Sequence, residues 1–338
     1  QDQQDARHIE NAEVARQLQL RFGEMQSGIY AKLVEKCGDR LYWENWSKKV
    51  GLIAKKFMER IAKLVSAVPA LKTEFDTFLK GLQTNLNPSV DEWQAIEMLA
   101  QHLISQPVFD ALFADYNFVN NNAVSRSMHK MIEQLETFGG FDKDTAGLES
   151  FYESVRVNVG NIDNLEGKQT IIKNLYEKFF KGAFPLTVEK LGIVYTPVEC
   201  VDFIIHSVNG ILKREFNTTL SDENVHILDP FAGTGTFITR LLQSGLIKPE
   251  DMERKYRHEI HCNEIVLLAY YIADVNIEAV YHYLMKPGRY VSYDGICLTD
   301  TFQLAETGEQ PFSSEFFREN SEEVEKQKKA PIRVIIGN

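Results

Sequence analysis

One stretch constrains the fold more than any other: residues 225–237, Val-His-Ile-Leu-Asp-Pro-Phe-Ala-Gly-Thr-Gly-Thr-Phe. Its apolar start passes directly into Asp229, and a tight turn with Gly233 and Gly235 follows before a helical pattern begins at Phe237. This order predicts a buried parallel strand, a loop and the start of a helix. Because glycine lacks the Cβ that would block a close ligand, we expect an adenosine-type cofactor at the carboxyl end of this strand.

The same loop narrows the class of cofactor. Loops that hold nucleotide phosphates contain a third glycine or end in Gly-Lys-Ser/Thr, and this loop has neither feature. Asp229 at the strand tip would repel a phosphate but attract an ammonium group. S-adenosylmethionine carries an α-amino group and a sulfonium and has no phosphate, so it is the cofactor that we predict. The alternative is an ordinary turn between a strand and a helix.

The segment from Asp229 to Phe237 resembles the cofactor-binding motif of DNA adenine-N6 methyltransferases. Four other segments resemble further motifs of that family, in the order of its gamma group: residues 192–197, 261–264, 298–302 and 334–338. The resemblance covers about residues 186–338. It implies a partial Rossmann-like α/β domain that binds S-adenosylmethionine and methylates an adenine flipped out of the DNA helix.

The resemblance also gives roles to individual residues. Glu264 would accept hydrogen bonds from the ribose hydroxyls, Asp300 would accept one from the cofactor adenine, and Ile265 would pack on that adenine. Thr299 precedes Asp300, where the family usually has glycine. Asn338 would be the catalytic residue, because its side-chain carbonyl would accept a hydrogen bond from the target amine and orient it. The other predicted cofactor-binding residues are Tyr195, Thr196, Pro197, Asp229, Phe231, Ala232, Gly233, Gly235, Thr236 and Phe237. The alternative interpretation is that Glu264 is a surface acid and that Ile265 is a core residue.

The sequence pattern of residues 1–185 predicts helices almost throughout. One helical face is apolar, and it is formed by Ile53, Phe57, Ile61, Leu64 and Val68. The lysines in the same segment are either a solvated surface or a patch that faces DNA or another domain. Residues 89–92, Ser-Val-Asp-Glu, predict a capped helix start, and Pro107 predicts the end or a kink of that helix. This half resembles, less specifically, the helical coupler of large single-chain Type I restriction-modification enzymes.

The second half alternates strands and helices, which predicts parallel strand pairing. Strands are expected at residues 225–229, 260–263 and 332–336, with another near 297–300. Helices are expected at 198–212, from 237 to about 245, and at 266–283. Residues 248–257 are interpreted as a charged surface link, and 307–330 as a mobile loop or a loosely held helix. The predicted fold class is therefore α+α/β: an all-α coupler domain at 1–185, followed by the partial Rossmann-like methyltransferase domain at 186–338.

The net charge, the spacing of the cysteines and the length of the apolar runs limit which ligands and partners we expect the chain to bind. The net charge is −11, and residues 186–338 contain 15 basic against 23 acidic side chains. An acidic surface opposes phosphate binding, so we expect double-stranded DNA to be held mainly by parts of a longer chain. The four cysteines lack metal-binding spacing, so no metal site is predicted, and reduced cytoplasmic thiols are the simplest interpretation. No apolar run approaches the ~18 residues of a membrane span, so no membrane partner is expected.

The sequence begins with Gln1 and ends within a motif, so we interpret it as part of a longer bacterial or archaeal restriction-modification enzyme. The resemblance implies nuclease and helicase parts upstream and a target-recognition domain downstream. The chain alone is expected not to methylate DNA, because Asn338 would be the only acceptor for the target amine. The alternatives are the modification subunit of a multi-subunit Type I system and a non-catalytic module that senses cofactor or joins domains. The ending Ile-Ile-Gly-Asn disfavours a methyltransferase for small molecules.

Overall fold

A computed structural model describes residues 39–112, 118–139, 152, 184, 196–306 and 316–338. The chain forms two compact units, residues 1–49 and residues 50–338. Of the first unit only residues 39–49 are described, and they are helical. The predicted motif at residues 192–195, including Tyr195, and the predicted boundary at 185/186 lie outside the described residues. The division into a coupler and a methyltransferase core therefore stays a prediction.

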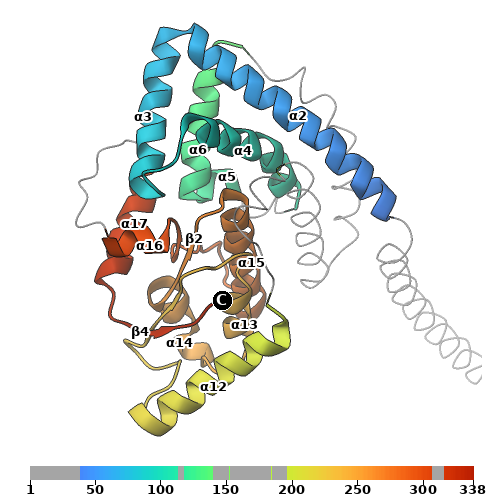
Figure 1. Cartoon of the computed structure of the whole chain (residues 1–338). Helices are drawn as coiled ribbons and strands as arrows, with labels where there is room; N and C mark the ends of the chain where they lie inside the picture. Colours follow the sequence, from blue (N-terminus) through green and yellow to red (C-terminus); the bar gives the residue numbers. More distant parts are fainter. Residues whose placement is uncertain (1–38, 113–117, 140–151, 153–183, 185–195, 307–315) are drawn as a thin grey trace, which may run out of the picture. The chain divides into compact units, whose positions relative to one another are not determined.

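The described part of residues 39–139 is helical, as predicted. It contains α2 (Asp39–Ala67), α3 (Pro69–Asn85), α4 (Glu92–Leu112), α5 (Phe118–Asn121) and α6 (Ala123–Glu136) (Figure 1). Phe57 and Ile61 are fully buried, which confirms the centre of the predicted apolar face of α2. Leu64 and Val68 are only half-buried, and Val65 is buried in their place.

The start of α4 has a capping box, although its residues differ from the predicted ones. The Asp91 carboxylate accepts from the Gln94 backbone N–H at 2.8 Å, and the Gln94 side chain accepts from the Asp91 N–H at 2.9 Å. Ser89 instead donates to the Asn87 side chain. The helix continues through Pro107 to Leu112, so of the two predicted outcomes, an end or a kink at the proline, the end is wrong. Buried apolar side chains on both sides of Pro107 favour continuation of the helix despite the missing N–H.

Four parallel strands form one sheet, at the places that the sequence predicts. They are β1 (His226–Asp229), β2 (Ile260–Glu264), β3 (Ile296–Leu298) and β4 (Ile332–Ile335), in the order β3-β2-β1-β4. Asp229 is in register with Cys262, and Glu264 with Leu298. Because the strands are parallel, their carboxyl ends share one edge of the sheet, which is where the predicted site residues follow them.

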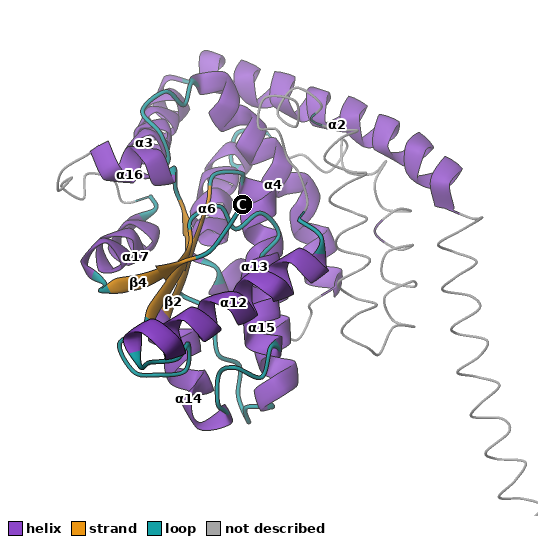
Figure 2. Cartoon of the chain, turned by 60° about the horizontal axis from the view of Figure 1, so that its bottom comes forward, coloured by secondary structure: helices purple, strands orange, loops and turns teal. Residues whose placement is uncertain are grey.

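Helices cover both faces of the sheet, as Figure 2 shows with α17 on one side and α13 and α15 on the other. The helices of this part are α12 (Val198–Phe216), α13 (Thr236–Gln243), α14 (Pro249–Arg254), α15 (Leu267–Met285), α16 (Thr301–Glu306) and α17 (Arg318–Lys329). The predicted helices at 198–212 and 266–283 are confirmed as α12 and α15. Among the described helices, none combines the length and apolarity that a membrane span requires.

Helix α15 is buried along nearly its whole length because it packs against β2 and β3 and is also covered by α4. Three of its polar side chains, Tyr270, Tyr271 and Asp274, bond to the helices before residue 139. The side chain of Asn122 caps α6 and donates to the Asp274 carboxylate at 2.7 Å and the Tyr270 hydroxyl at 3.1 Å. A buried His102 ring nitrogen lies 2.9 Å from the Tyr271 hydroxyl. The helices before residue 139 and the sheet thus share one core within the unit 50–338.

Two segments that the sequence assigns to the surface are held firmly. Residues 248–257 form α14 and the start of a π-helical turn, η4 (Lys255–Glu259). Lys255 is fully buried, where its ammonium bonds to the Val225 carbonyl and to Glu259, so this segment is not a surface link. In α17, the Asn320 side chain bonds to both the N–H and the carbonyl of Leu298 in β3. The described part of residues 307–330 is therefore neither a mobile loop nor a loosely held helix.

Candidate cofactor-binding site at the sheet edge

The candidate site begins with Asp229, the last residue of β1. Its side chain is fully buried, and one carboxylate oxygen, Oδ1, accepts from the Phe231 backbone N–H at 3.1 Å. The other oxygen, Oδ2, is buried without a hydrogen-bond partner. Burial raises the pKa of Asp229 to about 7, and the charge of Glu264 adds to the increase. An acceptor in this state favours a ligand that brings a donor or a positive charge.

Glu264, the last residue of β2, lies beside the glycine loop. Its Oε1 accepts from the N–H groups of Ile265 and Val266, at 2.9 and 2.7 Å, and its Oε2 accepts from the Gly233 N–H at 2.7 Å. Burial raises the pKa of Glu264 to about 7, although these three bonds oppose the increase. Each carboxylate oxygen has two lone pairs, so Oε2 keeps one acceptor position for a ligand hydroxyl.

The two loop glycines both have positive φ angles, but their surroundings differ. Gly233 has φ +56°, and a Cβ added there would meet no atom within 4 Å. Gly235 has φ +79°, and its added Cβ would lie 3.1 Å from the Cα and 3.2 Å from the carbonyl oxygen of Ala273 in α15. Gly233 therefore borders open space where a ligand fits, whereas Gly235 allows α13 and α15 to approach closely.

The end of the chain lies against the same carboxylate. A Cβ added at Gly337 would come within 2.8 Å of Asp229 Oδ1, so only glycine allows this approach. Asn338 is exposed, and its side-chain amide donates to the Thr196 hydroxyl at 2.8 Å. Pro197 is the N-cap residue of α12. The structure thus brings together predicted residues from three distant parts of the sequence.

An exposed apolar surface borders the loop. Phe231 is 43% exposed, Ile265 is 36% exposed, and Phe302 is 69% exposed. The Phe231 and Phe302 rings are 5.5 Å apart between centroids. Large exposed apolar side chains at the edge of a polar site are suited to contact the flat faces of an adenine. Phe302 is not among the predicted site residues, although it lies in the segment 298–302 that carries the resemblance.

Asp300 already has partners. Its Oδ2 accepts from the Asn87 side chain at 2.7 Å, and its Oδ1 accepts from the Phe302 N–H at 2.9 Å. The carboxylate therefore stabilises the start of α16 and ties it to the segment after α3. The predicted contact with the cofactor adenine would compete with these bonds, and it stays a prediction.

The remaining predicted residues support the loop. The Ala232 N–H donates to the Asn263 carbonyl at 2.8 Å, Thr236 is the first residue of α13, and Phe237 is a buried core residue. Thr301, which the sequence did not single out, donates to the Pro230 carbonyl at 2.7 Å. These bonds hold the loop between β2 and α16. No cluster of three or more potential metal ligands occurs within the described residues.

Comparison with known proteins identifies the class of protein. Residues 42–167 match the family model described as the coupler domain of Type ISP restriction-modification enzymes. A nuclease-deletion mutant of the Type ISP enzyme LlaGI, solved with a DNA substrate mimic, is 46% identical with a TM-score of 0.83. The ATP-dependent Type ISP enzyme LlaBIII, solved bound to DNA, is 47% identical with a TM-score of 0.83. A DrdV–DNA complex is 32% identical with a TM-score of 0.75.

Residues 42–167 thus match the Type ISP coupler domain, and the chain is similar to a segment of Type ISP restriction-modification enzymes. The matches cover 94% of this chain and 26% of the LlaGI chain, 95% and 22% for LlaBIII, and 88% and 29% for DrdV. The chain thus spans about a quarter of the length of these relatives. A comparison with curated protein sequences gave no significant match.

Proposed function

We propose that the edge formed by Asp229, the loop 230–236 and Glu264 binds S-adenosylmethionine. The observation that carries this proposal is the unpartnered, fully buried Oδ2 of Asp229, at the end of the strand that leads into the glycine loop. In that loop, a Cβ added at Gly233 would meet no atom within 4 Å. A ligand with an ammonium group would supply the missing donor and favour the ionised carboxylate. A ligand with a phosphate at this position would meet two buried carboxylates.

The other site residues have roles that fit the same ligand. The free acceptor position on Glu264 Oε2 would take a ribose hydroxyl. Phe231, Ile265 and Phe302 would cover the adenine faces and exclude water. When bound, S-adenosylmethionine supplies an electrophilic methyl group on its sulfonium.

We further propose that the chain is part of a DNA adenine-N6 methyltransferase, in which Asn338 accepts a hydrogen bond from the target amine. Its amide nitrogen donates to Thr196, which leaves the side-chain oxygen to act as the acceptor. The orientation of that amine is the contribution of Asn338, because the adenine amine is a weak nucleophile. The relatives were solved in complex with DNA or a DNA substrate mimic, which supports DNA as the partner, and we propose that this DNA is double-stranded.

The helical part would act as a coupler. Helix α4 contacts α15, Asn122 at the start of α6 bonds to Asp274 of α15, and α15 lies against the glycine loop at Ala273. Movement of these helices would therefore reach the cofactor loop through one shared helix. Nuclease, helicase and target-recognition parts elsewhere in the longer enzyme are the proposed partners.

The proposal is tested by methyl transfer from tritiated S-adenosylmethionine to an adenine-containing duplex, using the full-length enzyme and its Asn338→Ala variant. The DNA is digested to nucleosides and assayed for N6-methyl-2′-deoxyadenosine. We expect Asn338→Ala to abolish transfer while cofactor affinity changes by less than about threefold, because the side chain orients the amine and does not hold the cofactor. The matched control is Arg333→Gln, an exposed change on β4. Unchanged transfer by Asn338→Ala would contradict the assignment.

A further inference from the structure

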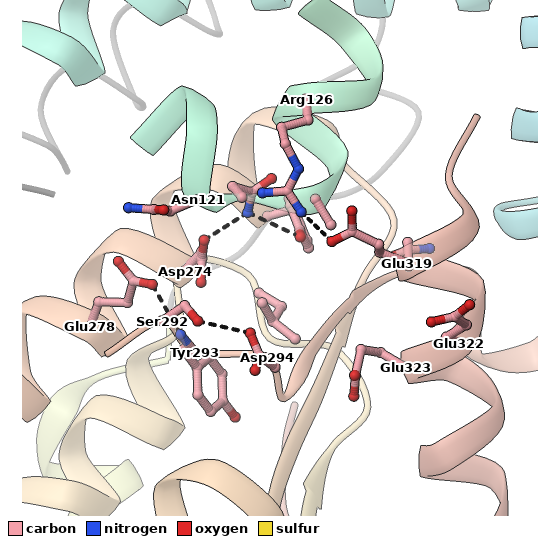
Figure 3. A pocket seen from close by; sticks show the side chains of 15 residues that line it. Asn121, Arg126, Asp274, Glu278, Ser292, Tyr293, Asp294, Glu319, Glu322 and Glu323 are labelled. Carbon is pink, nitrogen blue, oxygen red and sulfur yellow. Dashed lines mark hydrogen bonds and ion pairs between the residues drawn. The ribbon is translucent and has the colours of Figure 1, made fainter. Parts of the chain in front are cut away.

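A polar cavity lies between α6, α15, the loop before β3, and α17, away from the carboxyl ends of the strands (Figure 3). Its volume is about 360 Å³, which is enough for a small organic molecule. Six carboxylates line it: Asp274, Glu278, Asp294, Glu319, Glu322 and Glu323. Figure 3 shows Asp274 and Glu278 on one side and the glutamates of α17 on the other.

One carboxylate that lines this cavity, that of Asp274, has a buried oxygen with no hydrogen-bond donor. Its side chain is 3% exposed, and its Oδ2 accepts from Asn122 at 2.7 Å. Its other oxygen, Oδ1, is buried without a hydrogen-bond partner. A buried acceptor without a donor costs about 1–3 kcal/mol, so binding of a donor there is favoured.

The charged neighbours do not compensate for Asp274. Arg126 also lines the cavity, but it pairs with Glu319 and donates to the Asn120 carbonyl. Glu278 is occupied by the Tyr290 hydroxyl at 2.7 Å and the Tyr293 N–H at 3.0 Å. The carboxylates of the cavity therefore outnumber its cations, which favours a positively charged ligand.

The arrangement of the carboxylates restricts the ligand further. No three potential metal ligands among the described residues lie close enough to hold a metal ion. The carboxylates come instead from α15, from the loop before β3 and from α17, so a ligand with several separated positive groups matches them better than one ion. Tyr270, Tyr293 and Ile296 provide apolar surface between them. We propose that this cavity binds a linear aliphatic polyamine, with one ammonium group donating to Asp274 Oδ1.

Such a ligand would join the helices before residue 139 to the sheet. Asn122 and Arg126 belong to the N-terminal side of the cavity, whereas Asp274 and the α17 glutamates belong to the other side. A cation between them would stabilise their packing, because a ligand that binds only the folded state raises its stability. This site is separate from the proposed cofactor site and does not depend on it.

The experiment is calorimetric titration of the 338-residue chain with spermidine at constant ionic strength, together with a thermal unfolding scan. Mg²⁺ and additional NaCl are the controls for general screening of acidic charge. We expect spermidine to bind and to raise the unfolding temperature, and neither control to do so. Asp274→Asn should weaken binding about tenfold or more, because it removes a charged hydrogen bond.

Glu325→Gln is the matched control, because Glu325 lies on α17 but does not line the cavity. It should bind spermidine as the unchanged chain does. The double variant Glu322→Gln and Glu323→Gln removes two negative charges from the α17 side of the cavity. If Asp274→Asn does not fold, this double variant tests whether the cavity binds spermidine. It should weaken binding about threefold. The proposal is overturned if Mg²⁺ binds equally well, if spermidine has no effect beyond added NaCl, or if a folded cavity variant binds as the unchanged chain does.

Discussion

The two glycines of the loop should respond differently to the same substitution. In both Gly233→Ala and Gly235→Ala, alanine must adopt a positive φ angle, which costs about 1–2 kcal/mol. Both variants also gain the same reduction in unfolded-state entropy. The difference between the variants therefore isolates the one feature that they do not share, the contact of the new Cβ at position 235 with Ala273.

That contact is tight on both backbone atoms of Ala273, at 3.1 Å to Cα and 3.2 Å to the carbonyl oxygen. Backbone atoms inside a buried helix cannot rotate away, so α13 and α15 must separate. Overpacking of this kind costs about 1–3 kcal/mol. We expect Gly235→Ala to be less stable than Gly233→Ala by that amount, whereas Gly233→Ala should fold and lose affinity for S-adenosylmethionine.

Equilibrium unfolding in urea, followed by circular dichroism, measures this difference directly. Calorimetric titration of the folded variants with S-adenosylmethionine measures the second effect. Equal stability of the two variants would refute the packing role of Gly235. Normal cofactor affinity in Gly233→Ala would refute the ligand-bordering role of Gly233.

Three further outcomes follow from the structure. Asn122→Ala should lower the free energy of unfolding by about 2–4 kcal/mol in urea titrations, because a helix cap and two buried hydrogen bonds are lost. The control Glu136→Ala, an exposed change at the other end of α6, should change it little. Lys255→Met should cost about 3–5 kcal/mol because it leaves buried acceptors unpaired, and Lys213→Met, on the surface, is its control; equal losses would contradict this. Burial raises the pKa of Asp229 to about 7, so its ionisation costs folding stability as pH rises from about 4 to 7, but the ionised form binds an ammonium. Affinity for S-adenosylmethionine should therefore rise about eightfold between pH 6 and 7.5, in proportion to the ionised fraction of Asp229, and a flat profile by calorimetry would count against the site.

The sheet edge could be predicted because its signals are local. An apolar run followed by Asp229, and a second run that ends at Glu264, each identify a strand and its carboxyl end. Parallel pairing then requires these ends to lie at one edge, although the residues are far apart in the sequence. The same reasoning correctly placed β4 next to the site, where Gly337 lies against Asp229.

The remaining features depend on contacts that periodicity does not encode. Asn122 and Asp274 are 152 positions apart. Asn122 lies in a run of three asparagines that indicates only a turn, and Asp274 lies in a segment whose pattern indicates only a helix. Lys255 is charged and lies in a polar segment, so only the carbonyls and the carboxylate around it in the folded chain explain its burial. The partner of Asp300, Asn87, likewise belongs to a segment that the sequence assigns to another domain.

Asp229 is proposed to make this edge an S-adenosylmethionine site by binding the ammonium group of the cofactor. The most direct test is calorimetric titration of the chain and its Asp229→Asn variant with S-adenosylmethionine and with methylthioadenosine, which lacks the amino-acid part. We expect the unchanged chain to prefer S-adenosylmethionine by about tenfold or more, the value of one charged hydrogen bond. In Asp229→Asn that preference should fall to within about twofold. An undiminished preference in the variant, or tighter binding of methylthioadenosine by the unchanged chain, would contradict the binding of the cofactor ammonium group by Asp229.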